Sequence, residues 1–136
     1  MQYSYSIERD NYGEAGKASS NIKQTLKLLD IDGSILRRIA VASYEAEINM
    51  IIHSYGGNIT MDILEEGIVK LAFIDCGPGI PDVEKAMQPG YSTASEKARE
   101  FGFGAGMGLV NIKRVSDSFQ LDTSPCGTTL RIAFNL

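Results

Sequence analysis

The sequence has few of the residues that build covalent or metal-stabilised frameworks. It contains two cysteines, Cys76 and Cys126, and one histidine in 136 residues. Two cysteines are too few for a disulfide scaffold, and a structural zinc site would need four cysteine or histidine ligands. We therefore expect a reduced, cytoplasmic protein that is stabilised by an ordinary packed core.

Long apolar runs and an excess of positive charge are also missing. No stretch approaches the roughly 20 apolar residues of a membrane span, and the N-terminus lacks the basic and apolar regions of a signal peptide. The formal net charge of −4 argues against binding nucleic acid through bulk electrostatics. The same charge means that an anionic ligand must be held by local donors or by a metal. The balance of 43% hydrophobic and 22% charged residues is typical of a soluble globular domain.

Apolar periodicity predicts one α+β domain over residues 1–136. Helices are expected at about 14–30, 34–54 and 108–117, and strands at 2–8, 58–65, 67–75, 118–123 and 128–136. We expect Ser34 to cap the second helix, which is apolar nearly all round and should be buried on more than one side. The order of elements predicts a two-layer sandwich, in which helices cover one face of a mixed, mostly antiparallel sheet.

The stretch GFGAGMGLVNIKR, residues 102–114, carries a glycine at every second position and then turns helical. Such spacing is unfavourable for a strand or a helix. Bare backbone amides in front of a helix N-terminus can instead hold a phosphate. The stretch fits neither the dinucleotide fingerprint nor a Walker motif. A flexible loop without a ligand is the alternative.

Polar residues interrupt the apolar helix at 34–54. Glu45, Asn49 and His53 follow one another at intervals of four, so they share one face. Burying polar side chains on such a helix lowers the stability of the fold unless they have hydrogen-bond partners, so they are expected to be paired or functional. A carboxylate can act as a general base, and an asparagine oxygen suits Mg²⁺. A satisfied polar spine is the alternative, with His53 at its rim. Glu47 points elsewhere and is expected to be solvated.

A second carboxylate ends an apolar strand in the sequence FIDCGPGI. Asp75 comes just before a turn in which Gly77 and Gly79 allow close backbone approach. A carboxylate at a strand end, over a pocket, can accept a hydrogen bond from an exocyclic amine such as that of adenine. Thr128 opens the last strand, where its hydroxyl could reach the same ligand. An ordinary aspartate at a strand end is the alternative.

In this order the four motifs resemble the Bergerat-fold (GHKL) ATPases, a superfamily that includes gyrase, heat-shock chaperones, histidine kinases and mismatch-repair ATPases. The nearest likeness is to the small anti-sigma-factor and switch serine/threonine protein kinases of bacteria. EAEINMIIHSY looks like the helix of the anti-sigma kinases, and IPDVEKAMQPGYSTAS looks like the segment that leads to the lid of the switch kinases. The chain also lacks the dimerisation-and-phosphoacceptor helices that a histidine kinase needs.

The resemblance implies a role for each motif. Glu45 would be the general base, Asn49 would ligate a Mg²⁺ that bridges the phosphates of ATP, and Asp75 would bind the adenine amino group with support from Thr128. A lid over residues 89–108 would close on the phosphates. Further nucleotide-binding residues implied by the resemblance are His53, Gly77, Gly79, Ile80, Gly104, Ala105, Gly106, Met107, Gly108 and Leu109.

The implied function is a Mg·ATP-dependent serine/threonine kinase that phosphorylates a small regulatory protein, such as a sigma factor or an anti-sigma antagonist. A protein that sequesters such a partner without catalysis, and an ATP-hydrolysing conformational switch, are the alternatives. The strand at 2–8 offers an edge for a homodimer. The chain departs from the likeness in the insert ASEKAREFGF, where Lys97 or Arg99 could reach a γ-phosphate or could simply be solvated.

Overall fold

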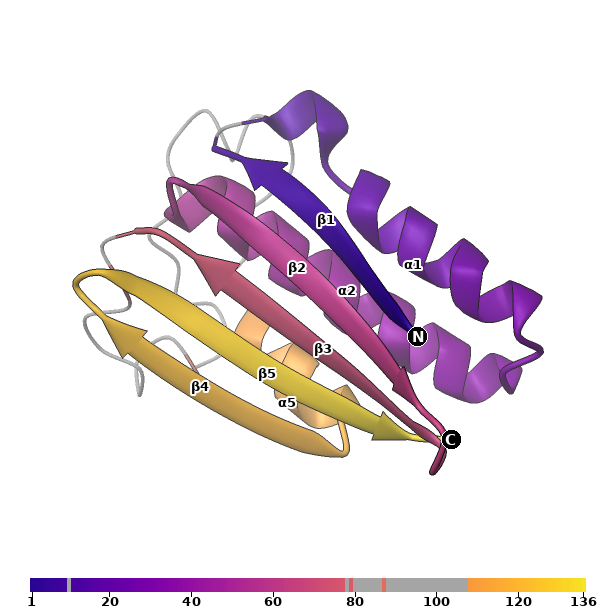
Figure 1. Ribbon diagram of the computed structural model, residues 1–136. Helices are drawn as coiled ribbons and strands as arrows, with labels where there is room; N and C mark the ends of the chain where they lie inside the picture. Colours follow the sequence, from indigo (N-terminus) through magenta and orange to yellow (C-terminus); the bar gives the residue numbers. More distant parts are fainter. Residues whose placement is uncertain (10, 78, 80–86, 88–107) are drawn as a thin grey trace.

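An antiparallel sheet forms one layer of the protein (Figure 1). The computed structural model describes residues 1–9, 11–77, 79, 87 and 108–136. Its five strands lie in the order β1-β2-β3-β5-β4, and all four pairings are antiparallel, so the expected mixed character is not found among the described strands. The strands are β1 (Gln2–Glu8), β2 (Gly56–Leu64), β3 (Ile68–Asp75), β4 (Ser118–Ser124) and β5 (Gly127–Asn135).

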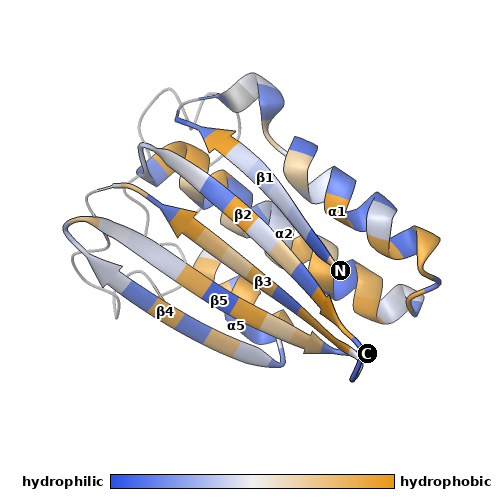
Figure 2. Cartoon of the chain, in the orientation of Figure 1, coloured by the Kyte–Doolittle hydropathy of each residue, from blue (hydrophilic) through white to orange (hydrophobic). Residues whose placement is uncertain are grey.

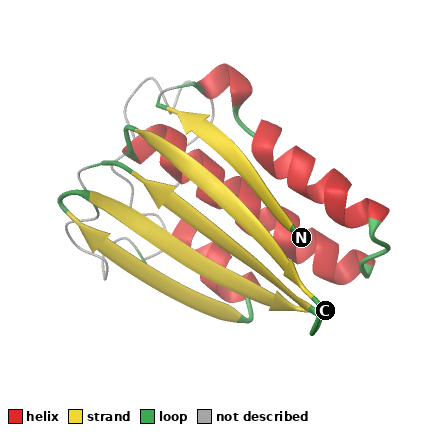
Figure 3. Ribbon diagram, in the orientation of Figure 1, coloured by secondary structure: helices red, strands yellow, loops and turns green. Residues whose placement is uncertain are grey.

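The helices of the described residues cover one face of this sheet (Figure 3). They are α1 (Lys17–Leu28), α2 (Gly33–His53) and α5 (Gly108–Val115), with a 3₁₀ turn at Tyr12–Glu14. Helix α2 lies between α1 and α5 and packs on both. None of the described helices is long and apolar enough to cross a membrane. The predicted two-layer α+β fold is therefore confirmed.

The core lies between the sheet and the helices. Alternation along β3 places Val69, Leu71 and Phe73 inside and exposes Lys70, and Figure 2 shows similar blue and orange bands along the strands. Side chains that are almost inaccessible to solvent include Ile22, Leu26, Ile39, Ile59, Met61, Leu71, Ile112 and Phe134. Both cysteines are free thiols.

Strand β2 begins two residues earlier than the sequence predicts. Gly56 and Gly57 lie before the strand expected at 58–65, yet they pair with Glu8 and Ile7 of the edge strand β1. A Cβ on Gly57 would lie 2.1 Å from the carbonyl oxygen of Ile74. The glycine is thus required by the close approach of β2 and β3, and it extends the sheet rather than ending it.

Helix α2 is capped by Asp32 and not by Ser34. The carboxylate of Asp32 accepts a hydrogen bond from the backbone N–H of Ser34 at 3.0 Å. A carboxylate satisfies an unpaired amide of the first turn and also interacts favourably with the helix dipole. The predicted burial of α2 on several sides is confirmed, although Val41 and Tyr44 remain exposed.

Helix α1 starts three residues later than expected, and its N-terminus is capped from α2. Gly16, with a left-handed φ of +91°, stands at the N-cap and offers no side chain. The carboxylate of Glu47 accepts hydrogen bonds from the backbone N–H groups of Gly16 at 3.2 Å, Ala18 at 3.3 Å and Ser19 at 3.0 Å. Glu47 is only 1% exposed, so the expectation that it is solvated was wrong. Its charge is balanced by amides that α1 would otherwise leave unpaired.

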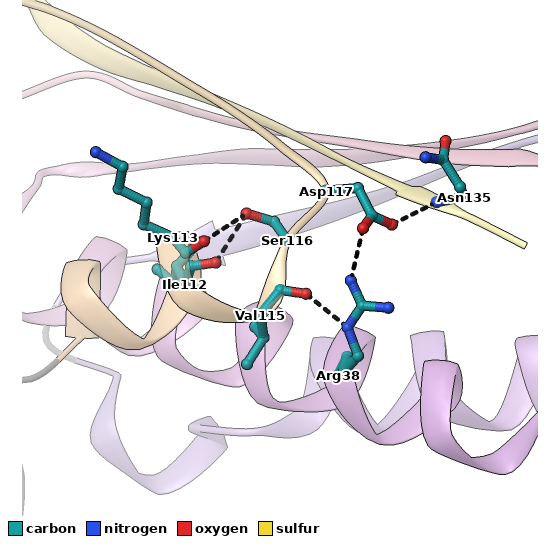
Figure 4. A network of polar contacts seen from close by, with 7 residues as sticks. All are labelled: Arg38, Ile112, Lys113, Val115, Ser116, Asp117 and Asn135. Atoms are coloured by element: carbon teal, nitrogen blue, oxygen red, sulfur yellow. Dashed lines mark hydrogen bonds and ion pairs between the residues drawn. The ribbon is translucent and has the colours of Figure 1, made fainter.

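The C-terminal end of α5 is fixed by Arg38 of α2 (Figure 4). The Arg38 guanidinium donates to the carbonyl of Val115 at 2.8 Å and to the carboxylate of Asp117 at 2.9 Å. Asp117 also accepts the backbone N–H of Asn135 at 2.8 Å. That amide and then Arg38 lower the pKa of Asp117. One side chain thus joins α2 to the end of α5 and to β5.

We predict that Glu47→Ala lowers the free energy of unfolding by roughly 3 kcal/mol, because several charge-assisted hydrogen bonds and the cap of α1 are lost together. Urea denaturation followed by circular dichroism measures the change. Glu14→Ala is the matched control, since Glu14 makes only an exposed ion pair with Lys17, and a shift below about 0.5 kcal/mol is expected there. Equal effects of the two substitutions would contradict the capping role.

Candidate functional site

The predicted site residues come from four elements that meet on one side of the protein. These are the C-terminal half of α2, the end of β3, the start of β5 and the start of α5, which lie opposite the two chain termini in Figure 1. Asp75 pairs in register with Gly57 on one side and with Thr128 on the other. The antiparallel order therefore brings the end of β3 beside the start of β5.

Asp75 is half-buried and uses one of its oxygens within the protein. Its Oδ1 accepts a hydrogen bond from the backbone N–H of Thr128 at 3.0 Å. Burial raises the pKa of Asp75, and the hydrogen bond from Thr128 partly opposes that rise. Within the described residues, no hydrogen bond to Oδ2 is found. An ionised aspartate accepts through both oxygens, so Oδ2 remains an acceptor for a ligand.

Thr128 supports Asp75 through its backbone and not through its hydroxyl. Its Oγ1 lies 2.9 Å from Oγ1 of Thr123 on the neighbouring strand β4. A hydroxyl has one donor and two acceptor positions. The hydroxyl of Thr128 therefore keeps capacity for a second partner beside Asp75.

The glycines after β3 hold their segment close to the rest of the protein. A Cβ on Gly77 would lie 3.1 Å from Cα of Ser54 and 3.5 Å from Oδ1 of Asp75, and a Cβ on Gly79 would lie 2.1 Å from the carbonyl oxygen of Ser124. The protein's own atoms therefore exclude a side chain at Gly79, and a side chain at Gly77 would crowd Ser54. Of these two predicted site residues, Gly77 lies next to Asp75, and Gly79 lies next to Ser124 of β4.

Glu45 faces helix α5. Its carboxylate is half-buried. Burial raises the pKa of Glu45, and the hydrogen bond from Asn111 opposes the rise. A carboxyl group with a raised pKa holds a proton more readily than an exposed glutamate does. Such a group is a candidate for proton transfer.

Asn49 lies one turn further along α2, beneath the first residue of α5. A Cβ on Gly108 would lie 3.0 Å from both Oδ1 and Nδ2 of Asn49. The missing side chain of Gly108 thus allows the amide of Asn49 to reach the N-terminus of α5. The side chain of Leu109, the next residue, packs against the core.

His53 ends α2, one turn beyond Asn49 on the same face. It is an exposed residue, and partial loss of water around its ring lowers the pKa of its imidazole. This position marks the rim of the site.

Several predicted residues lie outside the described part of the chain. They include nearly all of the expected lid over 89–108. The individual residues are Ile80, Lys97, Arg99, Gly104, Ala105, Gly106 and Met107.

Sequence reasoning missed Asn111. A helical position three residues after Gly108 lies on the same face as Gly108, one turn away. A polar residue there, directly behind the glycines, was the available signal. Its influence on the pKa of Glu45 could not be known before the two helices were placed together.

An open cavity of about 380 Å³ lies elsewhere, between β1 and the N-terminal part of α1. Its charged lining consists of Glu8, Glu14, Lys17 and Glu47. It contains none of the predicted site residues, and the amides of α1 already occupy Glu47. We therefore place the candidate site at Asp75, Asn49 and Glu45.

This arrangement offers three chemical groups to a nucleotide with a metal ion. The free oxygen of Asp75 can accept from an amine, the amide oxygen of Asn49 can ligate a hard cation, and the carboxylate of Glu45 can take a proton. The N-terminus of α5 adds amide donors and the positive end of a helix dipole. The residues present therefore fit Mg·ATP.

In sequence and in fold, the chain is similar to known ATPase domains. The family profile of the histidine kinase-like ATPase domain matches residues 11–134. The anti-sigma F factor of Bacillus licheniformis is 37% identical over 107 residues, covering 74% of this chain and 70% of that protein. The anti-sigma F factor of Priestia megaterium is 29% identical over 143 residues, covering 100% of this chain and 90% of that protein.

A solved structure shares the fold. The mycobacterial sensor histidine kinase MprB superposes with a TM-score of 0.57 at 16% sequence identity, covering 99% of this chain and 97% of that chain. At this identity the likeness concerns the arrangement of helices and strands alone.

Proposed function

Because the chain belongs to the histidine kinase-like ATPase family, we propose that it is an ATP-binding regulator of the anti-sigma-factor type that acts as a serine/threonine protein kinase. Family membership implies ATP binding, and the resemblance predicted from four sequence motifs is confirmed. The observation that carries the kinase proposal is that Asn49, one turn from Glu45 on the same face of α2, lies against Gly108 at the start of α5.

The adenine end of the nucleotide is assigned to Asp75. Its Oδ1 is held by the amide of Thr128, so Oδ2 is presented in a defined direction. An adenine amino group donates and a carboxylate accepts, which makes the pair complementary. The hydroxyl of Thr128 lies beside them, next to that of Thr123, and gives a second polar contact or holds a bridging water.

The phosphate end is assigned to the region between α2 and α5. The amide oxygen of Asn49 would ligate Mg²⁺, which usually keeps several waters and bridges phosphate oxygens. Gly108 exposes backbone at the start of α5, where N–H groups and the helix dipole favour an anion. The overall charge of −4 repels ATP at long range, so these local donors have to supply the attraction.

Phosphoryl transfer needs mainly positioning, charge neutralisation and a base. ATP would supply the phosphoryl group, and Mg²⁺ would neutralise its charge. The carboxylate of Glu45 would take the proton from the serine or threonine hydroxyl of a regulatory protein. The names of the relatives support a sigma factor or one of its regulators as that partner.

We predict that Asp75→Asn weakens ATP binding at least about tenfold, a loss of about 1.4 kcal/mol. An asparagine keeps one oxygen for the amide of Thr128, so the fold is retained, but its NH₂ group replaces the acceptor at Oδ2. Calorimetric titration with Mg·ATP measures the change. Asp122→Asn on the exposed side of β4 is the control, and unchanged affinity in the Asp75 variant would remove the proposed adenine site.

We predict that Glu45→Gln lowers protein phosphorylation by roughly 100-fold or more, since the general base is lost, while ATP affinity changes less than about twofold. The measurement is transfer of labelled phosphate from ATP to proteins encoded beside this one. Glu14→Gln serves as the control, because Glu14 is exposed and belongs to another part of the surface.

Two outcomes would redirect the proposal. If the wild-type protein binds its partner in Mg·ATP but no seryl or threonyl phosphate forms, the protein sequesters its partner without catalysis. If ATP is hydrolysed steadily without any partner, the lid and α5 instead work as a conformational switch.

A further inference from the structure

Arg38 of α2 contacts the end of α5 and its surroundings at three points (Figure 4). Its Nε donates to the carbonyl of Val115 at 2.8 Å, and its Nη2 donates to the carboxylate of Asp117 at 2.9 Å. The guanidinium also lies over the ring of Phe134, 5.7 Å from the ring centroid. Because a guanidinium presents its donors in a rigid plane, these contacts together fix its position.

The partners of Arg38 are themselves held by the sheet. The carboxylate of Asp117 accepts the backbone N–H of Asn135 on β5 at 2.8 Å, and the neighbouring side chain of Phe134 is completely buried. A cation at this place also lies near the carbonyl oxygens that a helix leaves unpaired in its last turn, where the helix dipole is negative. Arg38 therefore anchors the end of α5 to β5 as well as to α2.

Helix α5 depends on such an anchor because it is short. It has eight residues, and isolated helices shorter than about 12–15 residues are only marginally stable in water. The core buries its Ile112 completely, while Leu109 and Val115 are partly buried. The place of α5 on α2 is therefore set by the contacts at its two ends as well as by Ile112.

The other end of α5 lies at the candidate site. A Cβ on Gly108 would lie 3.0 Å from both Oδ1 and Nδ2 of Asn49, so no space remains for a side chain between the two helices there. Arg38 and Asn49 lie on one face of α2, about three turns and about 17 Å apart. Helices α2 and α5 thus run antiparallel, with Val115 at Arg38 and Gly108 at Asn49.

We propose that Arg38 is a positioning residue for the phosphate end of the nucleotide: by fixing the last turn of α5, it sets where the first-turn amides of that helix lie relative to Asn49. This inference rests on the proposed function, in which Mg²⁺ and the phosphates lie between α2 and α5. At about 17 Å from Asn49 along α2, Arg38 is too distant to contact them itself. Without its contacts α5 can shift along α2, and small displacements of groups that hold a ligand cost much of their effect.

The first test compares the affinity for Mg·ATP with that for adenosine, which has no phosphates. In Arg38→Met we expect the Kd for Mg·ATP to rise roughly tenfold, while the Kd for adenosine changes less than about twofold. Arg38→Lys keeps the charge and one donor, and a rise of about threefold for Mg·ATP is expected there. Calorimetric titration measures Mg·ATP binding and NMR titration measures adenosine binding, both below the temperature at which the variants unfold.

Arg131→Met is the matched control, because Arg131 also pairs with an aspartate, Asp122, at 3.4 Å, but both side chains are exposed. Its affinity for both ligands should equal that of the wild type. A general loosening of the fold in Arg38→Met would weaken the binding of adenosine and Mg·ATP equally, and that result would overturn the proposal. So would an unchanged affinity for Mg·ATP in Arg38→Met.

The second test needs no nucleotide. In ¹H–¹⁵N NMR spectra of the free protein, the backbone amide signal of Gly108 and the side-chain NH₂ signals of Asn49 should shift on Arg38→Met, while the side-chain signals of the exposed Asn21 stay in place. Unchanged signals of Gly108 and Asn49 would overturn the positioning role, whatever the affinity. A clear shift together with a wild-type protein that does not bind Mg·ATP would instead overturn the proposed function, and with it the role of Arg38 toward a nucleotide.

Discussion

Helix α2 is covered by the sheet, by α1 and by α5, so its polar side chains need partners inside the protein. Glu47 finds them in the amides of α1, and Arg38 finds them in the end of α5. These two contacts bind the neighbouring helices to α2. Asn49 lies where α5 begins, against Gly108. Arg38, Glu45 and Asn49 are spaced so that they share one face of α2, and Glu47 lies on another face.

The sheet supplies the other half of the candidate site. Its order places β5 beside β3, which brings the amide of Thr128 to Asp75. That hydrogen bond occupies one oxygen of a half-buried carboxylate, and within the described part of the chain the other oxygen accepts none. The site is therefore built from elements far apart in the sequence, each fixed by the core. Such rigid support is what phosphoryl transfer needs, since the protein mainly positions groups and neutralises charge.

The elements with clear periodicity were predictable. Alternation in β3 and helical spacing in α1 fix which faces are buried, and the motif order indicates the family. Partners across elements were not predictable. A helical wheel places Glu47 and Glu45 on different faces of α2. It does not reveal that backbone amides at the start of α1 donate hydrogen bonds to Glu47. Similarly, only the register between β3 and β5 shows that the backbone N–H of Thr128, and not its hydroxyl, donates to Asp75. The sequence analysis assigned the cap of α2 to Ser34, but Asp32, two residues earlier, provides it.

The central claim is that the nucleotide binds on the side of α2 that faces α5, and not at the cavity between β1 and α1. A ¹H–¹⁵N NMR titration of the wild-type protein with Mg·ATP tests it most directly. We expect the largest changes at the amides of Asn49, Gly77, Gly108 and Thr128, with those of Asn11 and Lys17 unchanged. Large changes confined to Asn11 and Lys17, which border the cavity, would contradict it.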